Sequence, residues 1–202
     1  KNTIEAFEGK LFGTGVESYT VGSHEFYDNY ALTRNKLWTI DAGHFHPTED
    51  VSDKFTAFLP FGGKGLMLHV SRPVRWDSDH VVIFDEALQR ITRSLVRDNL
   101  LDKTNIGLDF FDATINRVPA WVVGARATQK ALLQAMLAQI SDLKEAELHY
   151  DFTKRLAVTE ELKSYPFGAV WDEFCLRNDV PVGTDWLDSI HQYEKDVQFK
   201  RN

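Results

Sequence analysis

The stretch Lys36-Leu37-Trp38-Thr39-Ile40-Asp41-Ala42-Gly43-His44-Phe45-His46 holds a short apolar strand that ends in a carboxylate, with imidazoles close behind it. A similar arrangement occurs twice more: the run Gly65–Leu68 leads into His69, and Asn105–Leu108 leads into Asp109. An acidic side chain at the end of a buried strand is costly unless something compensates its charge. A divalent cation is a common compensation, so these strand ends predict the rim of a metal-binding barrel.

Strands and helices alternate on both sides of this stretch. The predicted strands cover residues 4–12, 36–41, 64–70 and 105–110, and the predicted helices cover residues 23–33, 51–59 and 85–100. Alternation at this spacing is typical of parallel βα units. A (β/α)8 TIM barrel has eight such units and usually needs about 250 residues, whereas about four units are present here. We therefore predict an α/β fold in which this chain supplies the C-terminal half of such a barrel, with an N-terminal half-barrel missing.

The character of the sequence changes after Asp109. A long helical pattern rich in Ala, Leu, Val and Gln covers residues 115–140. Further predicted helices cover residues 141–147, 150–163, 167–177 and 186–199. We divide the chain into a half-barrel that carries the metal ligands, residues 1–112, and a helical C-terminal extension, residues 113–202. The extension is expected to pack on the barrel or on a neighbouring subunit.

Composition and charge restrict the class of function. The net charge of −7 disfavours binding to nucleic acid or anionic lipid, because both require clustered Lys and Arg. No apolar run approaches the roughly 20 residues that span a bilayer, and no signal-peptide pattern opens the sequence. The single cysteine, Cys175, excludes an internal disulfide, which fits a reducing compartment. We expect a cytoplasmic protein that binds a small neutral substrate and cations.

Polar side chains gather at the predicted C-terminal ends of the strands, where parallel barrels carry out catalysis. They are Glu8, Lys10, Asp41, His44, His69, Asp77, Asp79 and Asp109. Carboxylates with two imidazoles and no thiolate suit Mn²⁺, Mg²⁺, Co²⁺ or Zn²⁺. The set exceeds one coordination shell, which predicts two metal positions. The structural alternatives are a turn or N-cap role for Asp41, an acidic turn at Asp77 and Asp79, and an ion pair between Lys10 and Glu8.

Long motifs of this chain resemble the L-rhamnose isomerase family. They are Glu8–Gly13, Ser18–Phe26, Asp41–Glu49, His69–His80 and Gly107–Asp112, followed by Asn116-Arg117 and Pro166–Trp171. The resemblance runs over nearly the whole chain and covers only the C-terminal half of the family's chain. It implies a homotetrameric, metal-dependent (β/α) barrel that interconverts L-rhamnose and L-rhamnulose in rhamnose catabolism.

The resemblance also implies roles for single residues. One metal site would consist of Glu8, Asp41, His69 and Asp109, and a more mobile catalytic metal, with Mn²⁺ preferred, would be held by His44, Asp77 and Asp79. Lys10 would lie beside the carbonyl end of the sugar, and His44 and Trp76 would contact the substrate. In the family the missing half supplies aromatic pocket walls and a histidine near the ring oxygen of the sugar.

Two chemical routes fit these residues. A divalent cation can polarise the sugar oxygens while a hydride passes from C2 to C1. Alternatively, a carboxylate such as Asp109 takes the C2 proton as a general base. The residues do not separate the routes, and we favour the hydride shift by analogy with related sugar isomerases. The rival functions are a non-catalytic half-barrel that needs its complement and a metal-dependent phosphodiesterase on a similar barrel.

Overall fold

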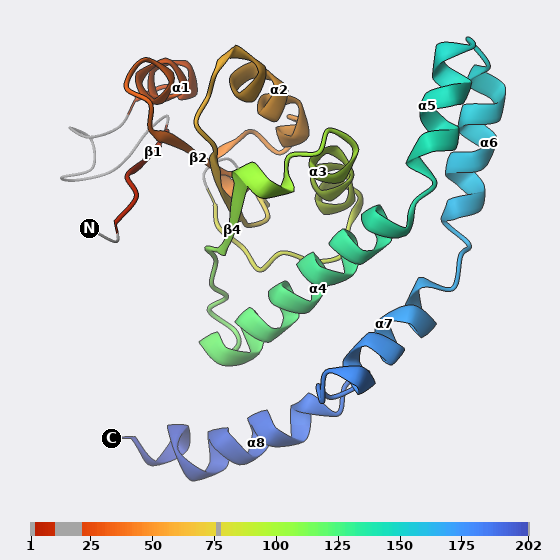
Figure 1. Ribbon diagram of the computed structural model, residues 1–202. Helices are drawn as coiled ribbons and strands as arrows, with labels where there is room; N and C mark the ends of the chain where they lie inside the picture. The colour runs from red at the N-terminus through yellow and green to blue at the C-terminus, as the bar shows by residue number, and fades with distance from the viewer. Residues whose placement is uncertain (1–2, 11–21, 76–77, 202) are drawn as a thin grey trace. The chain divides into compact units, whose positions relative to one another are not determined.

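The computed structural model describes residues 3–10, 22–75 and 78–201 and divides the chain into two compact units, Lys1–Ala131 and Leu132–Asn202 (Figure 1). The first unit alternates strands and helices as the sequence predicted. Its main elements are β1 (Ala6–Glu8), α1 (His24–Thr33), β2 (Leu37–Asp41), α2 (Phe55–Phe58), β3 (Leu66–Val70), α3 (Glu86–Arg97) and β4 (Thr104–Leu108). The class α/β is therefore confirmed.

The four strands form one sheet in the order β1-β2-β3-β4, and every neighbouring pair is parallel. Sequential order with helical crossovers is the arrangement of consecutive βα units, and it is consistent with half of a (β/α)8 barrel. Closure into a whole barrel remains a prediction. The sheet of the described residues has β1 and β4 as its two edges.

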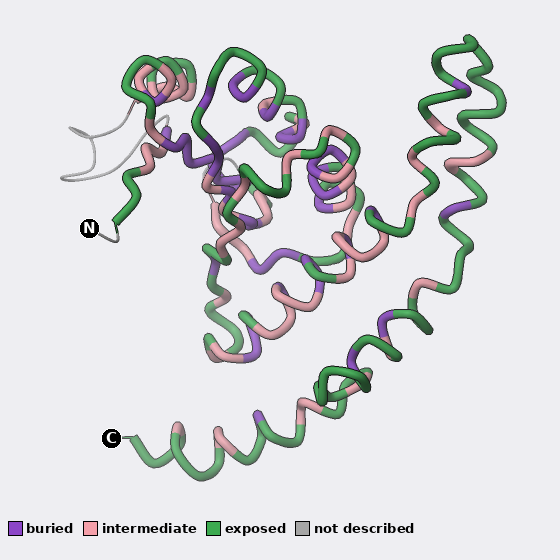
Figure 2. The backbone as a smooth tube through the Cα atoms, viewed as in Figure 1, coloured by how far each residue is buried: buried purple, intermediate pink, exposed green. Residues whose placement is uncertain are grey.

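The register of the sheet separates a helix-covered face from an opposite face that carries polar groups. Trp38 pairs with Leu66 and Ile40 pairs with Leu68, and all four residues are buried. The backbone coloured by burial in Figure 2 shows most of the buried residues in the first unit. Because side chains alternate along a strand, the intervening residues point the other way. The central strand β2 is buried along its whole length, which is expected of a parallel strand covered on both faces.

Helices supply the other half of this core. In α3, Leu88, Ile91 and Leu95 are buried, and the helix begins where the Asp85 carboxylate accepts a hydrogen bond from the backbone N–H of Leu88 at 3.0 Å. Such a carboxylate N-cap typically stabilises a helix by about 1 kcal/mol. The predicted helix over residues 85–100 is therefore confirmed, with its end three residues earlier.

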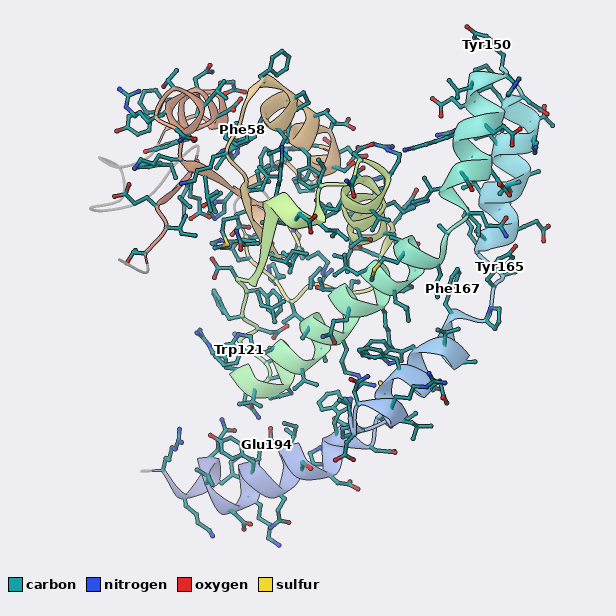
Figure 3. All side chains as sticks on the ribbon, viewed as in Figure 1. Phe58, Trp121, Tyr150, Tyr165, Phe167 and Glu194 are labelled. Carbon is teal, nitrogen blue, oxygen red and sulfur yellow. The ribbon has the colours of Figure 1, made fainter. Side chains whose placement is uncertain are left out.

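The predicted helix over residues 51–59 is only partly α-helical. A 3₁₀ turn covers Val51–Lys54, α2 follows, and a second 3₁₀ turn covers Leu59–Phe61. Pro60 provides no backbone N–H for further α-helical hydrogen bonds, and Gly62 then ends the segment with φ of +94°. The segment is still anchored to the sheet, because Phe58 (labelled in Figure 3) packs against Trp38 with ring centroids 5.6 Å apart.

The rest of the chain is helical, as predicted. Helix α4 (Arg117–Leu137) begins in the first unit and ends in the second, and its residues Ala120, Ala127 and Ala131 belong to the core of the first unit. The second unit continues with α5 (Ile140–Leu148), α6 (Phe152–Leu162), α7 (Phe167–Arg177) and α8 (Trp186–Asp196). The functional division after residue 112 remains a prediction.

Within the second unit, α5 and α6 form a hairpin (Figure 1). Tyr150 makes the turn with φ of +57°, and the guanidinium of Arg155 contacts the carboxylate of Glu147 at 2.9 Å. Large apolar side chains remain exposed in this unit, such as Leu148 at 77% and Phe199 at 79%. None of the described helices is both long enough and apolar enough to cross a bilayer.

Candidate metal centre

The strand register brings four predicted ligands to one face of the sheet, at the carboxyl ends of its strands. Asp41 is the last residue of β2 and pairs directly with His69 of β3, and His69 pairs with Gly107 of β4. Asp109 lies two residues beyond Gly107, so an extended backbone returns its side chain to the same face. Glu8 ends β1, and its β2 partner lies two residues before Asp41, which gives both side chains the same direction.

These four side chains make the first ligand group. His69 Nδ1 lies 3.2 Å from Asp109 Oδ2, 3.4 Å from Asp41 Oδ2 and 3.5 Å from Glu8 Oε1. One ligand atom from each of the four residues lies within 4.8 Å of the other three. Asp41 is 1% exposed, whereas the side chain of Asp109 is 60% exposed at the mouth of the group. The group is therefore buried on the side of the sheet and open to solvent on the side of Asp109.

A turn after β2 builds the second group, which consists of Asp41, His44 and Asp79. The 3₁₀ turn Ala42–His44 begins where Asp41 Oδ1 accepts a hydrogen bond from the N–H of Gly43 at 2.8 Å. This turn directs the ring of His44 back toward the strand ends. His44 Nε2 lies 3.7 Å from Asp79 Oδ2 and 3.9 Å from Asp41 Oδ2. Asp41 therefore belongs to both groups.

The two ring nitrogens of His44 have different neighbours: Nε2 faces Asp41 and Asp79, whereas Nδ1 lies near a backbone carbonyl and 3.5 Å from Glu8 Oε1. His44 Nδ1 lies 3.3 Å from the carbonyl oxygen of Gly9. A carbonyl oxygen can only accept a hydrogen bond, so Nδ1 carries the hydrogen, and in the neutral ring Nε2 keeps its lone pair for an ion. Histidines that bind metals commonly donate their second N–H to a carbonyl or carboxylate in this way.

Four buried atoms of the two groups have no hydrogen-bond partner among the described residues. They are Glu8 Oε1, Asp41 Oδ2, His69 Nδ1 and Asp79 Oδ1. An unsatisfied buried polar atom costs about 1–3 kcal/mol, and more when it is charged. Three of the four lie at the convergence point of the first group, where a single divalent ion would satisfy all of them. The donor set of carboxylate oxygens and imidazole nitrogens suits Mn²⁺, Mg²⁺, Co²⁺ or Zn²⁺, so the residues fit a metal centre.

The carboxylates shift the protonation of both imidazoles. Asp41 and Glu8 raise the pKa of His69 to about 10, although partial burial opposes the charged ring. Burial likewise opposes charge on His44, but Asp79, Asp41 and Glu8 outweigh it and raise the pKa of His44 to about 9. Burial also raises the pKa of Asp41, but hydrogen bonds and nearby imidazoles overcome that effect and leave the pKa below its ordinary value. Without metal, both imidazoles are therefore protonated at pH 7.

Metal binding should consequently release protons and strengthen as pH rises. Each imidazole that binds an ion must first lose its proton, so the Mn²⁺ affinity should rise roughly tenfold per pH unit for each proton released. Because the pKa values are about 9 and about 10, this rise should continue through pH 6–8. A histidine of ordinary pKa would stop responding near pH 7. Titration calorimetry in buffers of different ionisation enthalpy measures both quantities, and a flat affinity over pH 6–8 would contradict imidazole ligation.

The remaining predicted site residues have different outcomes. Trp76 and Asp77 lie outside the described residues. Lys10 is half-buried and forms an isolated antiparallel bridge with Gly22, so its proposed contact with the sugar stays a prediction. Asp79 lies with Asp41 and His44, whereas the sequence prediction grouped it with His44 and Asp77, and its role as a ligand stays a prediction.

Sequence reasoning missed three contributors: the carbonyl of Gly9, the backbone of Gly43 and the hydroxyl of Ser71. Ser71 has a signal in the sequence, because it follows His69 by two residues and so continues the same side of the strand. The two glycines act through backbone atoms, and their residue types alone do not indicate these contacts.

The structure is an α/β fold with a parallel four-strand sheet, and the ends of its strands bring together carboxylates and imidazoles that could hold a metal ion. The sequence profile of the L-rhamnose isomerase (RhaA) family matches residues 1–201. The chain belongs to the L-rhamnose isomerase family.

Relatives that carry the name L-rhamnose isomerase match along the whole chain. The protein of Lactiplantibacillus plantarum is 85% identical over 202 residues, which are 100% of this chain and 47% of the relative. The protein of Listeria innocua is 64% identical over 100% of this chain and 48% of its own length. The protein of Salmonella paratyphi B is 55% identical over 98% of this chain and 47% of its own length. The chain thus spans about half the length of these curated relatives.

Proposed function

We propose that this chain supplies the metal-binding half of an aldose–ketose isomerase that interconverts L-rhamnose and L-rhamnulose. One observation carries the proposal: in a chain of this family, buried ligand atoms without hydrogen-bond partners converge at the strand ends. Family membership favours this function over a metal-dependent phosphodiesterase. The length of the relatives supports the further proposal that turnover requires an N-terminal half-barrel.

The ligands divide between two ions in this proposal. Glu8, Asp41, His69 and Asp109 would hold one ion, and His44 and Asp79, together with Asp77, would hold the other. Mn²⁺ is our preferred ion, with Zn²⁺, Co²⁺ and Mg²⁺ as alternatives that the same donors suit. When bound, a divalent cation stabilises the negative charge that develops on O1 and O2 of the open-chain sugar.

The residues of this chain then orient the sugar and control its protons. We assign Lys10 to the carbonyl end of the sugar, and His44 and Trp76 to contacts with the substrate. In the favoured hydride route, the C2–H bond breaks with its electron pair, which forms the new C1–H bond, while a proton moves from O2 to O1. In the alternative route Asp109 takes the C2 proton as a general base. The side chain of Asp109 lies at the open mouth of the first ligand group. Its partial burial and the neighbouring carboxylates raise its pKa, which makes it a stronger base.

We also propose a cytoplasmic homotetramer. The exposed apolar side chains of the helical unit, Leu148 and Phe199 among them, are the kind of surface that subunit contacts cover. A single cysteine, Cys175, which is free and buried, suits a reducing compartment.

The metal assignment can be tested directly with Mn²⁺. Calorimetric titration of the chain should give a dissociation constant in the micromolar range or tighter, and His44→Ala should weaken binding at the second group by at least tenfold. His149→Ala is the matched control, because that imidazole is exposed and lies in the second unit. The same titrations should be repeated on a chimaera that joins this chain to the part of the Lactiplantibacillus plantarum relative that it does not match. Absence of Mn²⁺ binding by both proteins would refute the ligand assignment.

A further inference from the structure

The carboxylate of Asp41 is held by a hydroxyl that belongs to neither ligand group. Ser71 directly follows β3 and is 4% exposed. Its hydroxyl donates a hydrogen bond to Asp41 Oδ1 at 2.6 Å and accepts one from the N–H of Gly43 at 2.7 Å. The same N–H lies 2.8 Å from Asp41 Oδ1. The Asp41 carboxylate, the Ser71 hydroxyl and the N–H of Gly43 therefore form a buried ring of hydrogen bonds beside the two ligand groups.

This arrangement gives the two oxygens of Asp41 different environments. Oδ1 accepts hydrogen bonds from Ser71 and Gly43, whereas Oδ2 has no hydrogen-bond partner among the described residues and faces both imidazoles. Rotation of the carboxylate would exchange these environments and would break two buried hydrogen bonds. We propose that Ser71 is a positioning residue that fixes Asp41 with Oδ2 directed at the metal positions. The inference rests on the metal binding proposed above.

The backbone of Gly43 makes this arrangement compact. A Cβ atom at position 43 would lie 2.6 Å from Ser71 Oγ, 2.9 Å from the carbonyl oxygen of Ser78, and closer still to Asp79 Oδ1. Asp79 thus packs against the same turn that the Ser71 hydroxyl supports. Ser71 therefore contacts the bridging ligand Asp41 directly and lies next to the backbone that positions Asp79.

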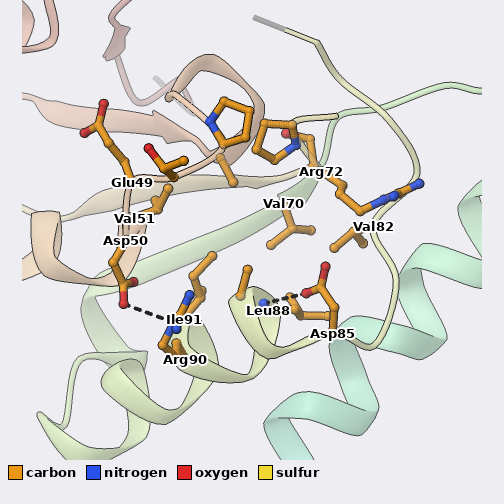
Figure 4. A pocket seen from close by; sticks show the side chains of 16 residues that line it. Glu49, Asp50, Val51, Val70, Arg72, Val82, Asp85, Leu88, Arg90 and Ile91 are labelled. Atoms are coloured by element: carbon orange, nitrogen blue, oxygen red, sulfur yellow. Dashed lines mark hydrogen bonds and ion pairs between the residues drawn. The ribbon is translucent and has the colours of Figure 1, made fainter. Parts of the chain in front are cut away.

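Two substitutions at position 71, which lies beside a cavity, separate the hydroxyl from packing. Ser71 lines a cavity of about 200 Å³ together with Ala42 and Val70 at the strand ends and Leu88 and Ile91 of α3 (Figure 4). Ser71→Thr and Ser71→Val are nearly identical in shape and differ in the hydroxyl, so their comparison isolates the hydrogen bond from packing.

The experiment compares four variants in the chimaera: Ser71→Ala, Ser71→Thr, Ser71→Val and, as a control, Ser94→Ala. Ser94 is also buried, at 6% exposure, but lies in α3 away from the ligands. Ser71→Ala and Ser71→Val should weaken Mn²⁺ binding by about 10–100-fold, the range typical of partners that orient metal ligands. Ser71→Thr should stay within about threefold of the wild type, and Ser94→Ala should not change. The visible absorption of the Co²⁺-loaded protein should change with Ala and Val and be restored by Thr.

Each outcome decides a separate question. If the wild type binds no Mn²⁺, the proposed metal site is refuted, and the role of Ser71 is refuted with it. If the wild type binds and the Thr and Val variants bind equally well with the same Co²⁺ spectrum, the positioning role is refuted. Thermal melts of the metal-free proteins show whether a variant folds. If Ser71→Ala does not fold, the Thr and Val pair still decides the question, because both carry the same steric change.

Discussion

Asp41→Asn should lower the Mn²⁺ affinity more than a hundredfold, beyond the range of 10–100-fold that is typical of residues that only orient a ligand. Among the described residues, Asp41 alone belongs to both ligand groups, and its Oδ2 lies 3.4 Å from His69 Nδ1 and 3.9 Å from His44 Nε2. Asparagine keeps the shape of the side chain and can still accept hydrogen bonds from Ser71 and Gly43. It removes the negative charge that both proposed ions would need.

Asp102→Asn is the matched control for this change, because Asp102 is an exposed carboxylate at the opposite end of the sheet, just before β4. Calorimetry with Mn²⁺ measures the affinity, and the Co²⁺ absorption spectrum reports on the geometry of each group. If Asp41→Asn bound Mn²⁺ within tenfold of the wild type, Asp41 would not be a ligand, and the carboxylate would serve the turn at Gly43 instead.

The second large effect concerns turnover. The chain alone should show no detectable conversion of L-rhamnose to L-rhamnulose, whereas the chimaera with the unmatched part of the Lactiplantibacillus plantarum relative should convert it. The physical reason is that the described sheet has four strands, with β1 and β4 as its edges, so this chain would enclose the proposed ligands on one side only. A sugar would be held on one side only, with water in contact with its reacting carbons.

The chimaera also distinguishes the two chemical routes. L-rhamnose that carries deuterium at C2 should give L-rhamnulose that retains the label at C1 if a hydride is transferred. A label that exchanges with solvent would favour proton abstraction by Asp109 instead. Efficient turnover by the 202-residue chain alone would refute the requirement for a second half-barrel.

The fold could be predicted from the sequence wherever its signal is local. Strand ends at Asp41, His69 and Asp109 are visible because an acid or imidazole directly follows an apolar run, and parallel pairing then brings such ends together. Helix α3 is equally clear, since apolar residues recur at helical spacing after an acidic N-cap. The division of the ligands into two groups came from the family resemblance. The structure brings Glu8, Asp41, His69 and Asp109 together, and it places His44 and Asp79 beside Asp41, while Asp77 lies outside the described residues.

Other features depend on contacts between distant residues and left little trace in the sequence. The hydrogen bond from His44 to the carbonyl of Gly9 joins positions 35 residues apart, and a carbonyl is present at every residue. The role of Ser71 depends on the turn at Gly43 folding against it, which residue types alone do not specify. Residues 51–59 were predicted as one helix that ends before Pro60, whereas their hydrogen bonding changes from 3₁₀ to α geometry and returns to 3₁₀ at Leu59–Phe61.

The alternation of side chains along β3 has an evolutionary consequence. Deletion of a single residue between Leu66 and His69 would turn the imidazole into the apolar layer beneath α3 and bring Leu68 out among the carboxylates. Insertions and deletions in this lineage should therefore be rarer within the strands than in the exposed loops between them. Within the strands, only changes of two residues at a time would keep the proposed ligands on one face.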